Sequence, residues 1–379
     1  MSVLNFLSEE TFIEHMDVTN KYLKCIADEV AVGFMFSSFA EIQTVVRSGR
    51  HLDLIPIGTQ IVTSRGGTNI TFDVIGKDID TPSDPSLTHS LTLLMHEPYD
   101  NIQFSAPQAM YYAEAELPAG TYNVTPRNGW SGGMGNGKTY QFTLTKPVPK
   151  GGQIVWNGEW NKDPINYKIK TYESQTSTTE IETVTPVEGS GGTELTPLNH
   201  PHRMCYGSNN YKESAIRQLI NSANPAGSVW TPQTKYDRPP NWVTSKAGLI
   251  NGLDTDFLSV IGKTKKKTAR CRLVDTGIDE TNDKFFLLSR SEFYAGNEYS
   301  DCDEGSPYPY FANYSDYTSP NTGVDKNRIK YKNGAPQWWW GRTPNSGSAY
   351  NVRNVYPAGQ LYSNSAYSTV GAVVACNII

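Results

Sequence analysis

Residues 338–344 read Trp-Trp-Trp-Gly-Arg-Thr-Pro, and residues 370–378 read Val-Gly-Ala-Val-Val-Ala-Cys-Asn-Ile. Between them, residues 345–369 consist mainly of Asn, Ser, Tyr, Gly and Ala. Tyr offers a large contact area with few rotatable bonds, while Ser, Asn and Gly supply adaptable hydrogen bonds, as in antibody-like binding sites. A tryptophan anchor, a surface of this kind and an apolar core strand together predict a recognition face, and they are unusual for an active site.

The tryptophan run and the polar stretch supply the predicted ligand-binding residues. Successive side chains of a strand point to opposite faces, so at least one tryptophan must enter the core. We expect two of the three to be structural and one to be half exposed below the binding face. The residues predicted to contact ligand are Trp340, Asn345, Ser346, Ser348, Tyr350, Asn351, Asn354, Tyr356, Tyr362, Asn364 and Tyr367.

Several sequence elements of the C-terminal half resemble one protein family. They are Trp-Trp-x-Arg-Thr-Pro at 339–344, Asn-Val-Arg-Asn-Val at 351–355, Gly-x-Leu at 359–361, Gly-Ala-Val-Val-Ala-Cys at 371–376, Tyr-Gly-Ser-Asn-Asn-Tyr-Lys-Glu-Ser-Ala-Ile-Arg-Gln-Leu-Ile-Asn at 206–221, Asp-Arg-Pro-Pro at 237–240 and Lys-Phe-Phe-Leu-Leu-Ser-Arg-Ser-Glu at 284–292. In these elements the chain resembles variable proteins diversified by retroelements, which carry a C-type-lectin-like fold and are common in phages and gut bacteria. The resemblance covers residues 203–379 well and residues 41–98 more loosely.

The residue types of the polar stretch fit that kind of diversification. Such retroelements change adenines in a copied template, and single changes in adenine-rich Asn codons lead to Ser, Thr, Tyr, Asp, His or Ile. Between these positions lie residues that a scaffold would keep, such as Pro344, Val352 and Gly359. The alternative is a Tyr- and Ser-rich loop of an ordinary β protein, because composition alone is a weak cue.

Composition limits the fold class and the kinds of partner. The chain has 379 residues, more than one typical domain, and its low hydrophobic content with abundant Gly, Pro and Tyr predicts a β-rich α+β protein. A net charge of −5 argues against a nucleic-acid or anionic-membrane binder. Since neither a signal peptide nor a spanning segment is evident, we expect synthesis in the cytoplasm, no membrane insertion, and a final place on a virion or an extracellular surface.

Four segments are predicted along the chain. Residues 1–39 carry an N-terminal helix at 8–30 for oligomerisation, with a trimer as the suggested state, or for attachment to other virion proteins; packing on its own β-domain is an equal alternative. Residues 40–100 open the lectin-like domain, and residues 101–202 form an inserted β-sandwich with a Gly/Ser/Thr-rich tether. Residues 203–379 complete the C-terminal C-type-lectin-like domain. The alternative organisation is three domains in series.

Two motifs are interpreted as structural. Residues 132–139 match the phosphate-loop pattern, but an alternating strand follows where nucleotide binding would need a helix, so a glycine-rich hairpin loop is expected. The basic run at 263–270 is expected to be a solvated face or edge protection, with an anion grip as the alternative.

Metal, cofactor and catalytic signals are weak. Calcium is the one cofactor left open, at Asp78-x-Asp80…Asp84 and at 301–305, by analogy with lectin-like folds alone. His200-Pro-His202 near Cys205 is a faint metal or thiol cue, but a junction loop is favoured because no zinc spacing is met. The five cysteines are expected to be buried free thiols. We predict no metal ligands and no catalytic residues.

The sequence therefore predicts a displayed ligand- or receptor-binding protein for phage host recognition, with a hypervariable C-terminal face. Its expected partner is a host cell-surface protein or glycan, and oligomerisation would raise weak contacts to useful avidity. The alternative is a structural virion decoration or a bacterial surface protein without a diversified binding role. An enzyme would need a catalytic residue, and none is predicted.

Overall fold

The computed structural model describes residues 36–127, 129–130, 137–157, 166–172, 178–233, 238–293, 296–311 and 326–379. The helix expected at residues 8–30 lies outside these ranges. The described part is β-rich with a few short helices, which confirms the predicted β-rich α+β class. Within it, no helix is long and apolar enough to span a membrane.

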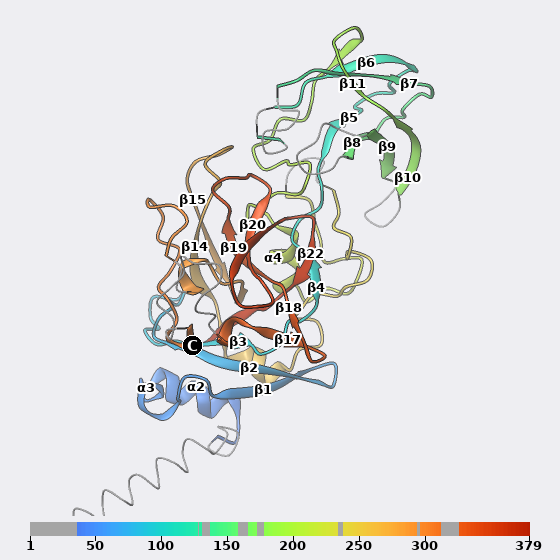
Figure 1. Ribbon diagram of the computed structural model, residues 1–379. Helices are drawn as coiled ribbons and strands as arrows, with labels where there is room; N and C mark the ends of the chain where they lie inside the picture. The colour runs from blue at the N-terminus through green and yellow to red at the C-terminus, as the bar shows by residue number, and fades with distance from the viewer. Residues whose placement is uncertain are drawn as a thin grey trace, which may run out of the picture.

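The centre of the body is a six-stranded sheet that joins the two ends of the described chain (Figure 1). Its strands are β1 (Gln60–Arg65), β2 (Thr68–Lys77), β3 (Leu91–Met95), β23 (Ala375–Ile378), β13 (Ile261–Gly262) and β16 (Phe285–Phe286). The last strand, β23, pairs antiparallel with β3 and also with β13 and β16. Every residue of β3 and β23 is buried, as expected of central strands covered on both faces.

A second, five-stranded sheet contains the tryptophan run. Its order is β21 (Leu361–Ser365), β20 (Asn351–Val355), β19 (Trp339–Pro344), β22 (Thr369–Gly371) and β4 (Asn101–Gln103). β4 falls inside the range 101–202 expected for the insert, yet it pairs with β22 in the body. Ile102 and Phe104 are fully buried in the core of the body, so the insert begins beyond them.

One hydrophobic core joins residues 42–104 to residues 211–378. The two segments therefore form a single domain interrupted by the insert. The helices that cover the body are α2 (Phe39–Arg47), α3 (His51–Leu54), α4 (Ala215–Ile220) and α5 (Thr255–Val260), with 3-10 turns η2 (Ser291–Phe293), η3 (Pro309–Phe311) and η4 (Lys326–Arg328). Ser38 caps α2 and Asp254 caps α5, each through side-chain oxygens that accept backbone N–H bonds.

The insert consists of two four-stranded sheets and projects from one end of the body (Figure 1). One sheet contains β5 (Ala109–Tyr112), β8 (Gln153–Asn157), β9 (Asn166–Tyr172) and β10 (Thr178–Val184); the other contains β6 (Gly120–Val124), β7 (Tyr140–Leu144), β11 (Val187–Glu188) and β12 (Thr193–Leu195). Their buried cluster includes Trp130, Phe142 and Tyr167 and extends to Tyr206 and Tyr350 of the body. The insert thus packs on the body through apolar side chains.

Two hairpins complete the body, and one of them contains the basic run at residues 263–270. β14 (Thr264–Ala269) pairs with β15 (Ile278–Asp283), and β17 (Lys330–Lys332) pairs with β18 (Ala335–Gln337). The basic run forms β14, where Lys265 and Lys267 are exposed but Lys266 is buried, so strand alternation turns one cation inward. The phosphate-loop match lies partly outside the described residues, and strand β7, not a helix, follows it.

Candidate functional site

The tryptophan run divides between core and surface where strand β19 begins. Trp339 and Trp340 are fully buried; the Trp340 indole N–H donates to the Ile102 carbonyl at 2.8 Å, and its ring packs against Phe104. Trp338 is half-buried. Two tryptophans are therefore structural, but Trp340 was predicted to contact ligand and cannot do so, because β19 lies between β20 and β22 with its side chains covered.

An exposed group of aromatic rings surrounds the remaining tryptophan. The ring centroids of Tyr356 and Tyr362 lie 4.5 and 5.5 Å from that of Trp338, both edge-to-face. Tyr356 is 40% exposed and Tyr362 is 55% exposed. We call Trp338, Tyr356 and Tyr362 the aromatic patch. Rigid aromatic side chains that protrude from a sheet are typical anchors of binding interfaces.

A row of polar side chains occupies strands β20 and β21. The register pairs Asn351 with Ser365 and Arg353 with Ser363, so these four side chains share one face of the sheet. The Ser365 hydroxyl donates to the Asn351 side-chain oxygen at 3.2 Å, and the Asn345 amide donates to the Ser363 hydroxyl at 3.1 Å. All are partly exposed. We call Asn351, Arg353, Ser363 and Ser365 the polar row.

Glu298 fixes the polar row and the loop beside it. The Arg353 guanidinium donates two hydrogen bonds to the Glu298 carboxylate, at 2.6 and 2.9 Å. The backbone N–H and hydroxyl of Ser346 donate to the same carboxylate at 2.9 and 2.7 Å. Burial opposes ionisation of Glu298, but these donors hold its pKa below the usual range. Sequence reasoning missed Glu298, because nothing local marks a residue that acts 55 positions away from its partner.

Other predicted contacts lie inside the molecule. Ser348 and Tyr350 are buried, and the Tyr350 ring packs edge-to-face on Tyr206 at 5.0 Å, where the insert meets the body. Asn354 is completely buried and its amide atoms have no hydrogen-bond partner among the described residues. These three predicted ligand contacts are corrected to interior positions: Ser348 and Tyr350 lie in the buried turn before β20, and Asn354 lies in β20 itself, an interior strand of the sheet.

The remaining predicted residues are at the surface. Ser346 is exposed, and Asn345, Asn351 and Asn364 are partly exposed. Tyr367 is 43% exposed and packs on Tyr206 at 5.8 Å, beside the insert and apart from the contacts of the aromatic patch. The accessible candidate site therefore consists of the aromatic patch, the polar row and the loop at 345–347.

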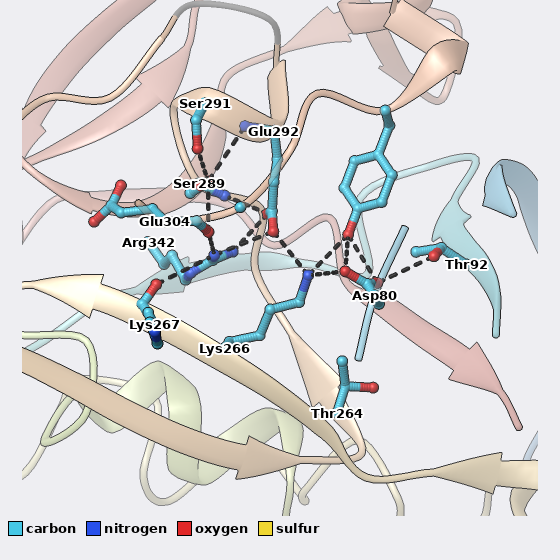
Figure 2. A network of polar contacts seen from close by, with 12 residues as sticks. Asp80, Thr92, Thr264, Lys266, Lys267, Ser289, Ser291, Glu292, Glu304 and Arg342 are labelled. Carbon is cyan, nitrogen blue, oxygen red and sulfur yellow. Dashed lines mark hydrogen bonds and ion pairs between the residues drawn. The ribbon is translucent and has the colours of Figure 1, made fainter. Parts of the chain in front are cut away.

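A buried network of charges lies under strand β19 (Figure 2). The Arg342 guanidinium donates to both Glu292 carboxylate oxygens, at 2.6 and 3.1 Å, and to the Leu287 carbonyl at 2.8 Å. Figure 2 shows Lys266 between Glu292 and Asp80; its ammonium donates to both. All four charged side chains are at most 5% exposed. Buried charges persist only when they are paired, so this network ties β19, β14, η2 and the segment after β2 together.

The pKa values of the two glutamates of this network shift in opposite directions. Burial disfavours the Glu292 carboxylate, but Arg342 and Lys266 outweigh it and lower the Glu292 pKa to about 2. Burial raises the pKa of Glu304, although Arg342 acts against this. The Glu304 carboxylate accepts from the Thr343 hydroxyl and from the Ala269 N–H. Such a network gives the strands above it a rigid base.

The oxygen-rich clusters do not assemble the suggested calcium sites. Asp80 belongs to the buried network, whereas Asp84 accepts from the backbone and hydroxyl of Ser86. Asp301 pairs with Arg272. Because these carboxylates turn toward separate partners, they do not converge on one point, and the sequence-based calcium suggestion has no geometric support here.

The described thiols are buried, and His202 at the junction contacts two carboxylates. The four described cysteines are free and buried, as predicted; Cys25 lies outside the described residues. Burial raises the pKa of the Cys205 and Cys376 thiols well above the usual range, which disfavours the reactive thiolate. The Nδ1 atom of His202 lies 2.6 Å from Glu213 Oε2, and its Nε2 atom lies 3.2 Å from Asp275 Oδ2.

Comparison with known proteins adds a partial family match. Residues 193–379 match a family described as a domain of unknown function (DUF6273). No curated protein and no solved structure matches the chain. The matched region begins in β12, the last strand of the insert, and it lacks β1–β4, which complete both sheets of the body.

Proposed function

We propose that this chain is a displayed binding protein whose aromatic patch and polar row recognise a host cell-surface protein or glycan for a phage particle. The observation that carries the proposal is the exposed aromatic patch, in which Tyr362 shares one face of edge strand β21 with the partly exposed Asn364, while the polar row lies on the other face of the same two strands. Aromatic rings supply apolar contact area at low entropic cost, and the neighbouring polar groups adapt to different ligands.

The proposed scaffold is a C-type-lectin-like domain interrupted by the sandwich insert. Two contacts support it. β3 and β23, from opposite ends of the body, pair at its centre, and the Ile216 N–H in α4 donates to the Phe104 carbonyl at 3.1 Å. The opening segment thus lies against residues 206–221, as the family resemblance implies when the insert is set aside.

Binding is favoured over catalysis by the chemistry of the accessible side chains. The patch and the row contain phenols, an indole, amides, hydroxyls and one guanidinium that is paired with Glu298. The strongest shifts of pKa belong to groups in the interior, away from this surface. A purely structural decoration remains the competing function, and it predicts that the exposed tyrosines are dispensable.

The decisive variant is Tyr356→Ala combined with Tyr362→Ala. Both side chains are exposed, so folding should be unaffected, and adsorption of particles carrying the variant to host cells should fall at least about tenfold, equivalent to about 1.4 kcal/mol. Tyr350 is left intact because it is buried, and its loss would confuse binding with stability.

Tyr331→Ala is the matched control, since Tyr331 is 49% exposed but lies in the β17–β18 hairpin. Adsorption should survive this change. If the double variant adsorbs as well as the unchanged protein while its melting temperature is preserved, the structural-decoration function replaces the binding function.

A further inference from the structure

Two histidines and one aspartate from separate segments meet at the end of the six-stranded sheet. His51 opens α3, Asp78 follows β2 and His89 precedes β3. One ligand atom from each of the three lies within 4.8 Å of those of the other two. We propose that His51, Asp78 and His89 form a binding site for one divalent first-row transition metal ion, with zinc as the prime candidate. This site is independent of what the aromatic patch binds.

The distances suit a shared ion. His51 Nε2 lies 3.1 Å from Asp78 Oδ1, and His89 Nδ1 lies 2.8 Å from Asp78 Oδ2. Around a tetrahedral zinc ion with bonds of about 2.0–2.1 Å, neighbouring ligand atoms are about 3.3 Å apart. Small side-chain movements therefore suffice to place all three donors around one ion.

Accessibility also suits a site with an open position. The His51 side chain is fully buried, while His89 and Asp78 are 32% and 25% exposed. His89 also lines a small cavity of about 100 Å³ together with Arg47, Ser86, Leu87 and Thr88. An ion could enter from this side, and a water molecule could complete its coordination.

The local backbone is arranged around the three donors. Asp78 has φ +54°, in the left-handed region that non-glycine residues rarely adopt, and such strain is concentrated at functional positions. The Ser90 backbone N–H donates a hydrogen bond to the Asp78 carboxylate at 2.8 Å. Gly49 has φ +75°, and a Cβ there would lie 3.1 Å from His89 Nε2, so glycine leaves room for the ring. His51 Nδ1 is buried without a hydrogen-bond partner in the described part of the chain, so the Nε2 contact with Asp78 and the edge-to-face contact with the His89 ring orient this imidazole.

The donor set selects the class of ion. Two imidazole nitrogens with one carboxylate oxygen suit zinc, nickel or cobalt, whereas calcium and magnesium prefer all-oxygen sites. A second group, His200, His202 and Glu213, is a weaker candidate. In this group the His202 backbone N–H donates to His200 Nδ1 at 3.2 Å, so the lone pair of that nitrogen is already engaged.

The test is calorimetric titration of the purified full chain with zinc chloride after chelator treatment, with thermal unfolding measured in parallel. We expect one zinc ion per chain, a raised melting temperature and no response to calcium chloride. His89→Gln should weaken zinc binding at least tenfold. His96→Gln is the matched control, because His96 is also exposed and bonded to an aspartate, Asp73, but stands outside the site. His202→Gln tests the second group.

Any one of three results would overturn the proposal. It fails if zinc does not bind, if His89→Gln binds zinc as the unchanged protein does, or if His202→Gln abolishes binding instead. Should His89→Gln not fold, the cobalt spectrum of the unchanged chain decides. Intense visible absorption indicates a tetrahedral site as proposed, and a weak octahedral spectrum contradicts it. None of these outcomes depends on host adsorption, so the metal site and the binding function can fail separately.

Discussion

At the scale of single residues, Arg342 fixes the buried strand β19 to neighbouring segments through charged contacts. Its guanidinium has a planar array of donors that matches the Glu292 carboxylate and nearby carbonyls, which the point charge of a lysine would not. Removing one member of a buried pair strands the other charge in the interior. The network therefore makes the position of β19 depend on a small number of charged side chains.

The two glutamates of this network predict opposite effects of the same substitution. Glu292→Gln should destabilise the fold by about 3–5 kcal/mol at pH 7, because it leaves Arg342 and Lys266 without their shared carboxylate. The Glu292 pKa is lowered from 4.5 to about 2, so this contribution is complete above about pH 4.5 and is lost as pH falls toward 2. Chemical denaturation between pH 3 and pH 8 measures it.

Glu304→Gln is the paired control. The Glu304 pKa is raised, so its contribution to stability is complete below 4.5 and is lost as pH rises through the folded-state pKa. Removing this charge should therefore leave stability at pH 7 unchanged or higher. An equal loss of unfolding free energy in both variants at pH 7 would contradict the opposite pKa shifts of the two carboxyl groups.

At the scale of elements, β20 and β21 determine which positions can vary. Val352, Asn354 and Val355 are buried, whereas Tyr356, Tyr362 and the loop at 345–347 reach the surface. Because β20 is an interior strand and β21 is the edge strand of the sheet, a diversifying process can change the outer positions without disturbing the packing of the inner ones.

Sequencing of residues 330–379 across a natural population of this gene tests that separation. We expect substitutions at Ser346, Tyr356, Tyr362 and Asn364, at adenines of their codons, while the Val352 and Val355 codons stay constant because their side chains fill the core. Variation spread evenly over buried and exposed positions, or none at all, would speak against a diversified binding face.

At the scale of the whole molecule, the body depends on both of its separated segments. β23 is buried between β3 on one side and β13 and β16 on the other, and residues 60–95 supply three of the six strands of this sheet. The chain leaves and re-enters the body at adjacent points, since the Gln108 N–H donates to the Met204 carbonyl at 2.9 Å.

Two fragments test this dependence. Residues 193–379, the region of the family match, should not unfold cooperatively on their own, because β23 would lose its β3 partner. Residues 36–107 joined by a short glycine linker to residues 205–379 should fold cooperatively, although with a lower melting temperature because Tyr206 and Tyr350 lose insert contacts. Thermal unfolding by circular dichroism separates the two. A cooperative transition in the shorter fragment would contradict the single-domain arrangement.

Local sequence patterns determined the β-rich class, the strands around Tyr140 and Leu91 and the buried state of the four described thiols. These features follow from side-chain periodicity and from the preferences of neighbouring residues, which act over a few positions. The same patterns could not say which tryptophan faces outward, because alternation fixes a period of two but not which face is covered.

Only the tertiary structure decided the contacts between distant segments. It buried Trp340 and left Trp338 at the surface, paired Arg342 with Glu292 across 50 positions, and brought Glu298 to Arg353. It also placed β4 in the body and gathered His51, Asp78 and His89. The physical reason is the same for all of these contacts. A buried side chain needs a partner of matching polarity or charge, and the folded chain supplies that partner from a distant segment. Local sequence patterns carry no information on which distant residue it will be.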